Sequence, residues 1–131
     1  MGFTAGGWGA EVYRSPLRCH RGEYHAGQLV TAAYGLREPA EPTLAPEAIA
    51  QAQLILVPAL AVDRQGVRLG RGAGFYDRSL HLVAPGTRLV AVVHDDELVE
   101  QLPAEPHDVP MTHAFTPGSG LVALGFARAV E

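Results

Sequence analysis

The sequence contains no lysine, and all ten of its basic side chains are arginine. This excludes a Walker-type phosphate loop, a lysine Schiff base and pyridoxal chemistry within the chain, because each of them needs a lysine side chain. The formal net charge is −4 and no run of basic residues is present. Since proteins bind nucleic acid by neutralising its phosphates, we predict no nucleic-acid partner.

Cysteine and long apolar runs are also scarce. The single cysteine, Cys19, cannot form an intrachain disulfide, which is typical of a protein in a reducing cytoplasm. The longest apolar stretch, residues 54–62, is interrupted by Pro58, whereas a membrane helix needs about 20 apolar residues. The N-terminus shows no basic region followed by an apolar run, the pattern of a signal peptide. We therefore predict a cytoplasmic protein with no membrane partner.

The length of 131 residues predicts a single domain. Apolar residues make up 47% of the chain and charged residues 18%, which excludes a disordered tail. Glycine dominates the first ten residues, and arginine is frequent up to residue 22. We expect loop or poorly ordered chain over residues 1–22, and an extended loop from residue 24 to residue 42.

The rest of the chain alternates between apolar runs and helix signals. Residues 54–57 and 88–94 are compact apolar runs typical of strands buried in a parallel sheet. Proline and acidic residues at helix starts predict helices over residues 46–53 and 95–102, and a third helix is expected over residues 75–83. Residues 59–74 are expected to form a long loop, and short strands are expected at residues 112–116 and 121–124. This order predicts an α/β fold.

Residues 62–80, VDRQGVRLGRGAGFYDRSL, carry the clearest chemical signal. Gly70, Gly72 and Gly74 allow close backbone approach to a ligand, and amide groups in such a loop can bind an anion. Arg68 and Arg71 add forked donors that match phosphate oxygens. Asp77 offers a carboxylate for Mg²⁺. The sequence therefore predicts a phosphate site next to a metal site.

Each of these signals has a simpler alternative. Glycine repeats are common in turns, and the arginines could be solvated surface residues. Asp63 is more typical of a turn or hydrogen-bonding residue than of a catalyst, and Asp108 between prolines could also be a turn former. His107 and His113 suggest zinc, but two histidines without a matched third ligand are a weak signal.

The string VPALAVDRQGVRLGRGAGFYDRSL resembles the signature of the 5-formyltetrahydrofolate cyclo-ligase family. Two further segments are similar to family patterns: YGLREP at residues 34–39 and EPHD at residues 105–108. The likeness covers residues 22–125 or thereabouts. It implies a three-layer α/β/α sandwich with a mostly parallel sheet, N-terminally truncated relative to the family.

The resemblance also implies ATP-dependent closure of 5-formyltetrahydrofolate to 5,10-methenyltetrahydrofolate, with ATP and 5-formyltetrahydrofolate as small-molecule substrates and Mg²⁺ as the metal. It implies catalytic roles for Arg68, Arg71 and Tyr76, and Mg²⁺ ligation by Asp77 and Asp108. Glu38, Phe75 and Tyr76 would contact the folate. The residues that would line the nucleotide are Arg68, Leu69, Gly70, Arg71, Gly72, Ala73, Gly74, Phe75 and Tyr76.

Several positions depart from the family pattern. Residues 1–20 match nothing in it, Ala73 stands where glycine or lysine is usual, and Phe75 replaces a frequent tyrosine. No counterpart is seen for the family's N-terminal helix that reaches ATP or for its folate-binding glutamate. From these departures we expect slow turnover by this chain, and exposed apolar sheet surface that favours self-association. The alternative is a non-catalytic module of the same fold that binds folate or phosphate.

Overall fold

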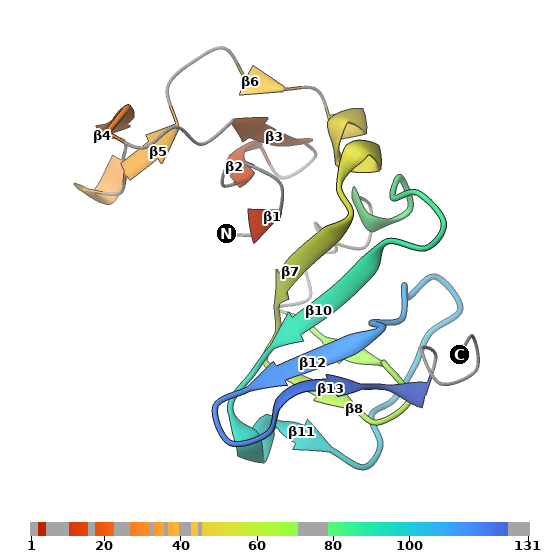
Figure 1. Cartoon of the computed structure of the whole chain (residues 1–131). Helices are drawn as coiled ribbons and strands as arrows, with labels where there is room; N and C mark the ends of the chain where they lie inside the picture. Colours follow the sequence, from red (N-terminus) through yellow and green to blue (C-terminus); the bar gives the residue numbers. More distant parts are fainter. Residues whose placement is uncertain are drawn as a thin grey trace.

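A computed structural model describes residues 3–4, 11–15, 18–22, 27–31, 33–35, 37–39, 43–44, 46–70 and 79–125 of the chain. A five-stranded sheet forms its centre, in the order β1-β7-β10-β12-β13. Its strands are β1 (Phe3–Thr4), β7 (Leu54–Pro58), β10 (Arg88–Val92), β12 (His113–Thr116) and β13 (Gly120–Ala123). The three middle strands run parallel, and the two outer strands are antiparallel to their neighbours (Figure 1).

The two apolar runs predicted as strands are confirmed as β7 and β10, which pair in register from Leu54 opposite Arg88 to Pro58 opposite Val92. Alternate residues of β7 point into the core, where Ile55 and Val57 are buried. In β10, three successive residues are buried, so this strand is covered on both faces, as its continuous apolar sequence predicts. The predicted strands near the C-terminus are confirmed as β12 and β13.

One core cluster lies against a single face of this sheet. Its buried members are Ile49, Ala52, Ile55, Val57, Val62, Leu80, Leu89, Ala91, Val93, Met111, Ala114 and Leu124. These residues come from the sheet, from the helix before β7, and from the segments that connect the strands. The connecting segments therefore share one hydrophobic core with the sheet, and they are the segments that carry most of the predicted site.

A second, three-stranded sheet packs beside the central one, in the order β11-β8-β9. It consists of β8 (Ala61–Asp63), β9 (Arg68–Leu69) and β11 (Leu98–Val99). The prediction of a loop over residues 59–74 is therefore wrong at residues 61–69, where β8 and β9 form a hairpin. The remainder of that loop beyond residue 70 lies outside the described residues.

The helices differ from the sequence predictions in type and length. The helix expected over residues 46–53 is a 3-10 helix, η2 (Pro46–Gln51). The helix expected over residues 95–102 is wrong, because only η3 (Asp95–Glu97) is helical and β11 follows at once. Of the helix expected over residues 75–83, only Ser79 and Leu80 are helical among the described residues, and residues 81–83 form a turn and a bend.

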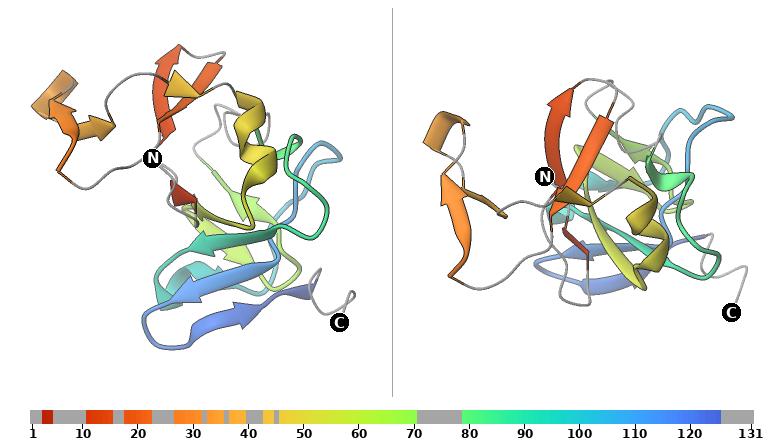
Figure 2. Two further views of the ribbon diagram at one scale, coloured as in Figure 1. Left: turned by 45° about the horizontal axis from the view of Figure 1, so that its top comes forward. Right: turned by 90° about the horizontal axis from the view of Figure 1, so that it is seen from above.

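The N-terminal part of the chain contains more strand than the sequence predicted. In place of loop, β2 (Glu11–Ser15) pairs with β3 (Arg18–Gly22), which pairs in turn with β6 (Thr43–Leu44). Within the expected extended loop, β4 (Leu29–Thr31) and β5 (Arg37–Pro39) form a hairpin around η1 (Ala33–Gly35). This hairpin projects away from the five-stranded sheet in both views of Figure 2. No helix of the described residues is long and apolar enough to span a membrane.

Candidate functional site

Arg68 lies at the carboxyl end of the central parallel strands. Its Nη1 donates a hydrogen bond of 3.2 Å to the carbonyl oxygen of Pro58, the last residue of β7. Pro58 stands opposite Val92, the last residue of β10. Ligands of open α/β sheets bind in the crevice at the carboxyl ends of the strands. The guanidinium of Arg68 is therefore at the sheet edge where such a fold binds its ligand.

Gly70 lies two residues after Arg68, and its Cα is close to the guanidinium of that arginine. A Cβ atom at Gly70 would lie 2.8 Å from Nη1 of Arg68, so a larger residue there would require the guanidinium to move from this position. Leu69 is about half exposed and pairs with Ala61 across the β8–β9 hairpin. The other predicted residues of this segment lie outside the described residues, and their roles stay predictions: Arg71, Gly72, Ala73, Gly74, Phe75, Tyr76 and Asp77.

Asp108 lies in the loop between β11 and β12, where it closes a turn with Glu105. Its Oδ2 accepts a hydrogen bond of 2.8 Å from the Glu105 amide, and its own amide donates one of 3.0 Å to the Glu105 carbonyl. Nε2 of His107 lies 3.2 Å from Oε2 of Glu105 and 3.7 Å from Oδ1 of Asp108. The turn-forming interpretation of Asp108 is confirmed. Ligation of Mg²⁺ by this residue stays a prediction.

His81 joins the end of the glycine-rich segment to the loop that carries Asp108. Its Nε2 lies 3.2 Å from the carbonyl oxygen of His107. The sequence reasoning did not single out His81, although its position directly after the last residue of the motif was the available signal. The contact brings the C-terminal end of residues 62–80 next to Asp108, two parts of the sequence whose proximity was not predicted from spacing.

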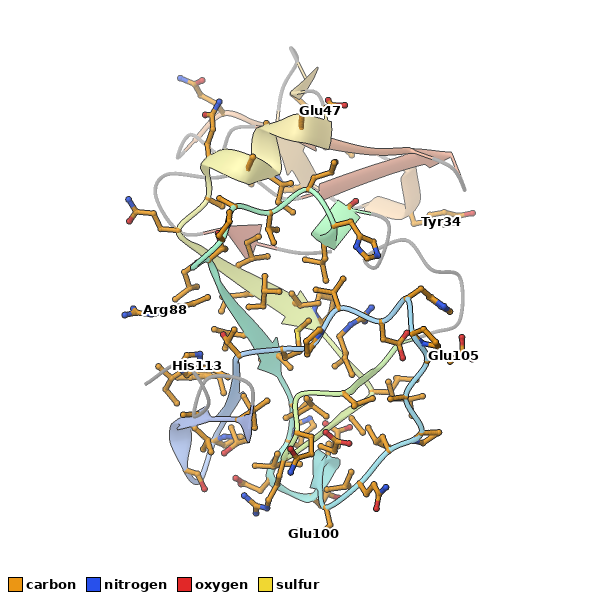
Figure 3. The ribbon with its side chains drawn as sticks, turned by 90° about the vertical axis from the view of Figure 1, so that its right-hand side faces the viewer. Tyr34, Glu47, Arg88, Glu100, Glu105 and His113 are labelled. Carbon is orange, nitrogen blue, oxygen red and sulfur yellow. The ribbon has the colours of Figure 1, made fainter. Side chains whose placement is uncertain are left out.

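Glu38 is not brought close to these residues. It lies in β5, opposite Val30 of β4, in the hairpin that projects away from the central sheet (Figures 1 and 2). Tyr34, at the tip of the same hairpin, is almost fully exposed and has a positive φ of 58° (Figure 3). A folate contact by Glu38 stays a prediction.

The carboxylates and imidazoles of the described residues are dispersed. No group of three or more His, Cys, Asp or Glu side chains suited to holding a metal ion is present in the described part of the chain. Nδ1 of His113 lies 2.7 Å from Oγ1 of Thr112, in a separate place from His107. A Mg²⁺ site that uses one or two carboxylates together with substrate phosphates needs no larger cluster. Asp108 supplies oxygen donors of the type that this ion prefers.

Comparison with known proteins shows the family of this chain. The sequence profile of the 5-formyltetrahydrofolate cyclo-ligase family matches residues 11–117. The chain belongs to this family. The match begins at residue 11, within the segment where the sequence reasoning found no likeness, and it includes the described part of the glycine-rich segment and Asp108.

Individual relatives agree with this assignment. The chain is 61% identical over 109 residues to the 5-formyltetrahydrofolate cyclo-ligase of Mycolicibacterium smegmatis, covering 83% of this chain and 56% of that protein. It is 40% identical over 70 residues to the Escherichia coli cyclo-ligase, covering 53% of this chain and 38% of that protein. The chain thus spans about half the length of the curated relatives it matches.

Solved structures agree as well. The structure of Aquifex aeolicus 5,10-methenyltetrahydrofolate synthetase superposes with a TM-score of 0.67 at 28% identity, covering 87% of this chain and 56% of that one. The Mycoplasma pneumoniae synthetase superposes with a TM-score of 0.56 at 19% identity, which shows a common fold. The predicted α/β fold is confirmed by these neighbours. The sheet itself is mixed, with its parallel strands in the middle.

Proposed function

We propose that this chain carries the phosphate-binding part of a 5-formyltetrahydrofolate cyclo-ligase and takes part in the ATP-dependent conversion of 5-formyltetrahydrofolate to 5,10-methenyltetrahydrofolate. Membership of the family is the observation that carries the proposal. The reaction transfers the γ-phosphoryl group of ATP to the formyl oxygen. The N10 nitrogen then attacks the formyl carbon, and the oxygen leaves with phosphate, so that ADP and phosphate are the other products.

The residues of this chain suit the demands of phosphoryl transfer, which needs positioning and neutralisation of charge more than covalent chemistry. Arg68 has a guanidinium at the carboxyl edge of the sheet. In our proposal it contacts nucleotide phosphates together with Arg71 and the backbone of residues 69–74. Phe75 and Tyr76 offer flat faces for a ring system of the nucleotide or folate, and Glu38 contacts the folate.

We assign Mg²⁺ to Asp77 and Asp108. The ion, when bound with ATP, neutralises charge on the phosphate oxygens. The turn with Glu105 holds the carboxylate of Asp108 in one orientation, and the side chain is 26% exposed, so that water or a ligand can reach it. A carboxylate that is both oriented and accessible is suited to ligation.

The test is the rise in absorbance of 5,10-methenyltetrahydrofolate when the chain is mixed with ATP, Mg²⁺ and 5-formyltetrahydrofolate. Asp108→Asn keeps one side-chain oxygen that can accept the Glu105 amide but removes the charge. We expect it to weaken Mg²⁺-dependent ATP binding by about tenfold or more, measured by titration calorimetry. Asp96→Asn, the same change at an exposed residue, is the matched control.

The outcomes separate the alternatives. Product that forms only when ATP and 5-formyltetrahydrofolate are both present supports the cyclo-ligase. Binding of ATP or folate with no turnover favours the non-catalytic module, and failure to bind either compound contradicts both. An Asp108→Asn protein whose ATP affinity still depends on Mg²⁺ as strongly as the parent's contradicts the assignment of this ligand.

The proposal includes a cytoplasmic location and self-association of the chain. A single cysteine supports a cytoplasmic enzyme. The exposed side chains of Val92, Phe115 and Leu121 support self-association, because they are adjacent in register across β10, β12 and β13. Light scattering over a range of protein concentrations tests self-association, and a constant monomer mass would contradict it.

A further inference from the structure

The turn between β8 and β9 is built around the buried carboxylate of Asp63, whose residue is 1% exposed. Its Oδ1 accepts hydrogen bonds from the amides of Gln65 and Val67, at 2.9 and 2.8 Å. The backbone amide of Asp63 donates to the Val67 carbonyl at 2.9 Å, and the Gly66 amide donates to the Asp63 carbonyl at 3.0 Å. One carboxylate oxygen is therefore sufficient to hold the turn itself.

The second oxygen of Asp63 reaches a distant part of the chain. Oδ2 accepts a hydrogen bond of 2.8 Å from the amide of Leu102, which is 39 residues away in the sequence. Leu102 comes just before Pro103, where the proline-rich loop towards β12 begins. This bond contributes nothing to closing the β8–β9 turn, so its effect is on the loop.

The other end of the same loop is held by the same turn. The amide of Met111 donates a hydrogen bond of 2.7 Å to the carbonyl of Gly66. The two backbones approach so closely that a Cβ atom at Gly66 would overlap the carbonyl oxygen of Met111, and Gly66 has a φ of +98° that favours glycine. Residues 103–110 thus leave the turn at Leu102 and return to it at Met111, with Asp108 in between.

The turn is also joined to the glycine-rich segment, because β9 begins at Arg68 and leads within two residues to Gly70. One turn therefore fixes both the strand that presents Arg68 and the loop that presents Asp108. Figure 3 shows the chain from Glu100 to Glu105 running along one side of the molecule. The exposed ion pair between Arg64 and Glu100 joins the same two segments at the surface.

We propose that Asp63 is a positioning residue, which holds residues 103–110, and Asp108 among them, in a fixed relation to β9 and Arg68. Its consequence for ligand binding rests on the proposed function. A carboxylate suits this task because its two oxygens accept in different directions, one within the turn and one towards the loop. Because Asp63 is 1% exposed, water replaces a lost bond to its carboxylate poorly.

Asp63→Asn separates the two tasks of the side chain. The amide oxygen is expected at the Oδ1 position, since the opposite orientation would set the NH₂ group against two N–H donors in place of one. The turn is then kept, and the Leu102 amide faces another donor. We expect hydrogen exchange of the Leu102 amide to rise by about tenfold or more while that of Val67 stays protected. Asp96→Asn is the matched control.

Two further readouts distinguish positioning from a purely structural role. Positioning predicts that the amide signals of residues 103–110 shift in the NMR spectrum of Asp63→Asn, while those of β7 stay in place. It also predicts that Mg²⁺-dependent ATP affinity falls by about tenfold at a temperature below the thermal midpoint, where the Asn protein is still folded. If the Asn protein does not fold, Asp63→Ser, whose hydroxyl can serve the turn but is too short for Leu102, takes its place.

Unchanged exchange at Leu102, or unchanged signals over residues 103–110, would overturn the proposal. An ATP affinity that is unaltered although Leu102 exchanges faster would also overturn it. If the parent chain binds no ATP, the proposed function fails separately, and the exchange and NMR readouts still decide whether Asp63 positions the loop.

Discussion

The parallel strands β7 and β10 and the β8–β9 hairpin contribute to one core cluster, but the strands and the turn of the hairpin are stabilised by different interactions. Ile55, Val57, Leu89 and Ala91 are held by the burial of apolar surface, which is not directional and depends mainly on volume. The turn is held by hydrogen bonds that Asp63 accepts from the amides of Gln65, Gly66 and Val67, and these bonds depend on the position of single atoms. The sheet therefore tolerates conservative exchange of its side chains, whereas the turn does not.

The largest effect is expected from a cavity in the sheet. Leu89 is 4% exposed, and Leu89→Ala removes buried methyl groups that the surrounding side chains cannot fully replace. We expect a loss of about 2–5 kcal/mol in the free energy of unfolding, measured by urea denaturation. Leu121→Ala, at a residue that is 53% exposed in β13, is the matched control and should cost far less. Equal losses in the two proteins would show that β10 is not the centre of the core.

The difference between the two regions also explains what the sequence could predict. The apolar runs predicted β7 and β10 nearly to their ends, because β10 is buried on both faces and β7 is buried on one face and half-buried on the other. The glycines and arginines around residue 70 indicated a phosphate site, and the described part, Arg68 and Gly70, lies at the carboxyl edge of the sheet. These signals are local in the sequence, so they can be detected without a structure.

One failure, the helix expected over residues 95–102, lies where acidic side chains accept hydrogen bonds from backbone amides. The acidic residues after β10 suggested a long helix, but the carboxylate of Asp95 accepts from the Gly118 amide and that of Glu97 from the His94 amide. They stabilise one short turn and its contact with the β12–β13 connection. The hydrogen bond between Asp63 and Leu102 likewise cannot be predicted from the spacing of apolar residues in the sequence. Such pairings are fixed by tertiary structure, which spacing does not show.

A smaller loss of stability is expected from Gly66→Ala, which tests the β8–β9 turn directly. An alanine there meets both an unfavourable φ of +98° and the carbonyl of Met111. We expect Gly66→Ala to lower the free energy of unfolding by about 2–4 kcal/mol, the sum of the strain and overpacking costs. Gly86→Ala is the control, since Gly86 has a φ of +85° with nothing within 4 Å of a Cβ atom.

The comparison of the two glycines isolates the contact with Met111. Gly86→Ala should cost only the conformational term, about 1–2 kcal/mol. If the two alanine proteins have the same urea midpoint and slope, the close approach of Gly66 to Met111 contributes nothing, and the turn does not hold that end of the loop as tightly as the hydrogen bond indicates.

The smallest effect is expected at the surface link between the same two segments. Nε of Arg64 lies 3.1 Å from Oε1 of Glu100, but the two side chains are 49% and 87% exposed, so water screens the pair and both side chains lose entropy in forming it. We expect Glu100→Gln to change the free energy of unfolding by less than about 1 kcal/mol, with the difference shrinking further in 1 M salt. Asp63→Asn, measured beside it, removes a buried hydrogen bond between the same segments and should not respond to salt in this way. A large loss in Glu100→Gln that shrinks in 1 M salt would mean that the surface ion pair, and not the buried carboxylate, joins the loop to the turn.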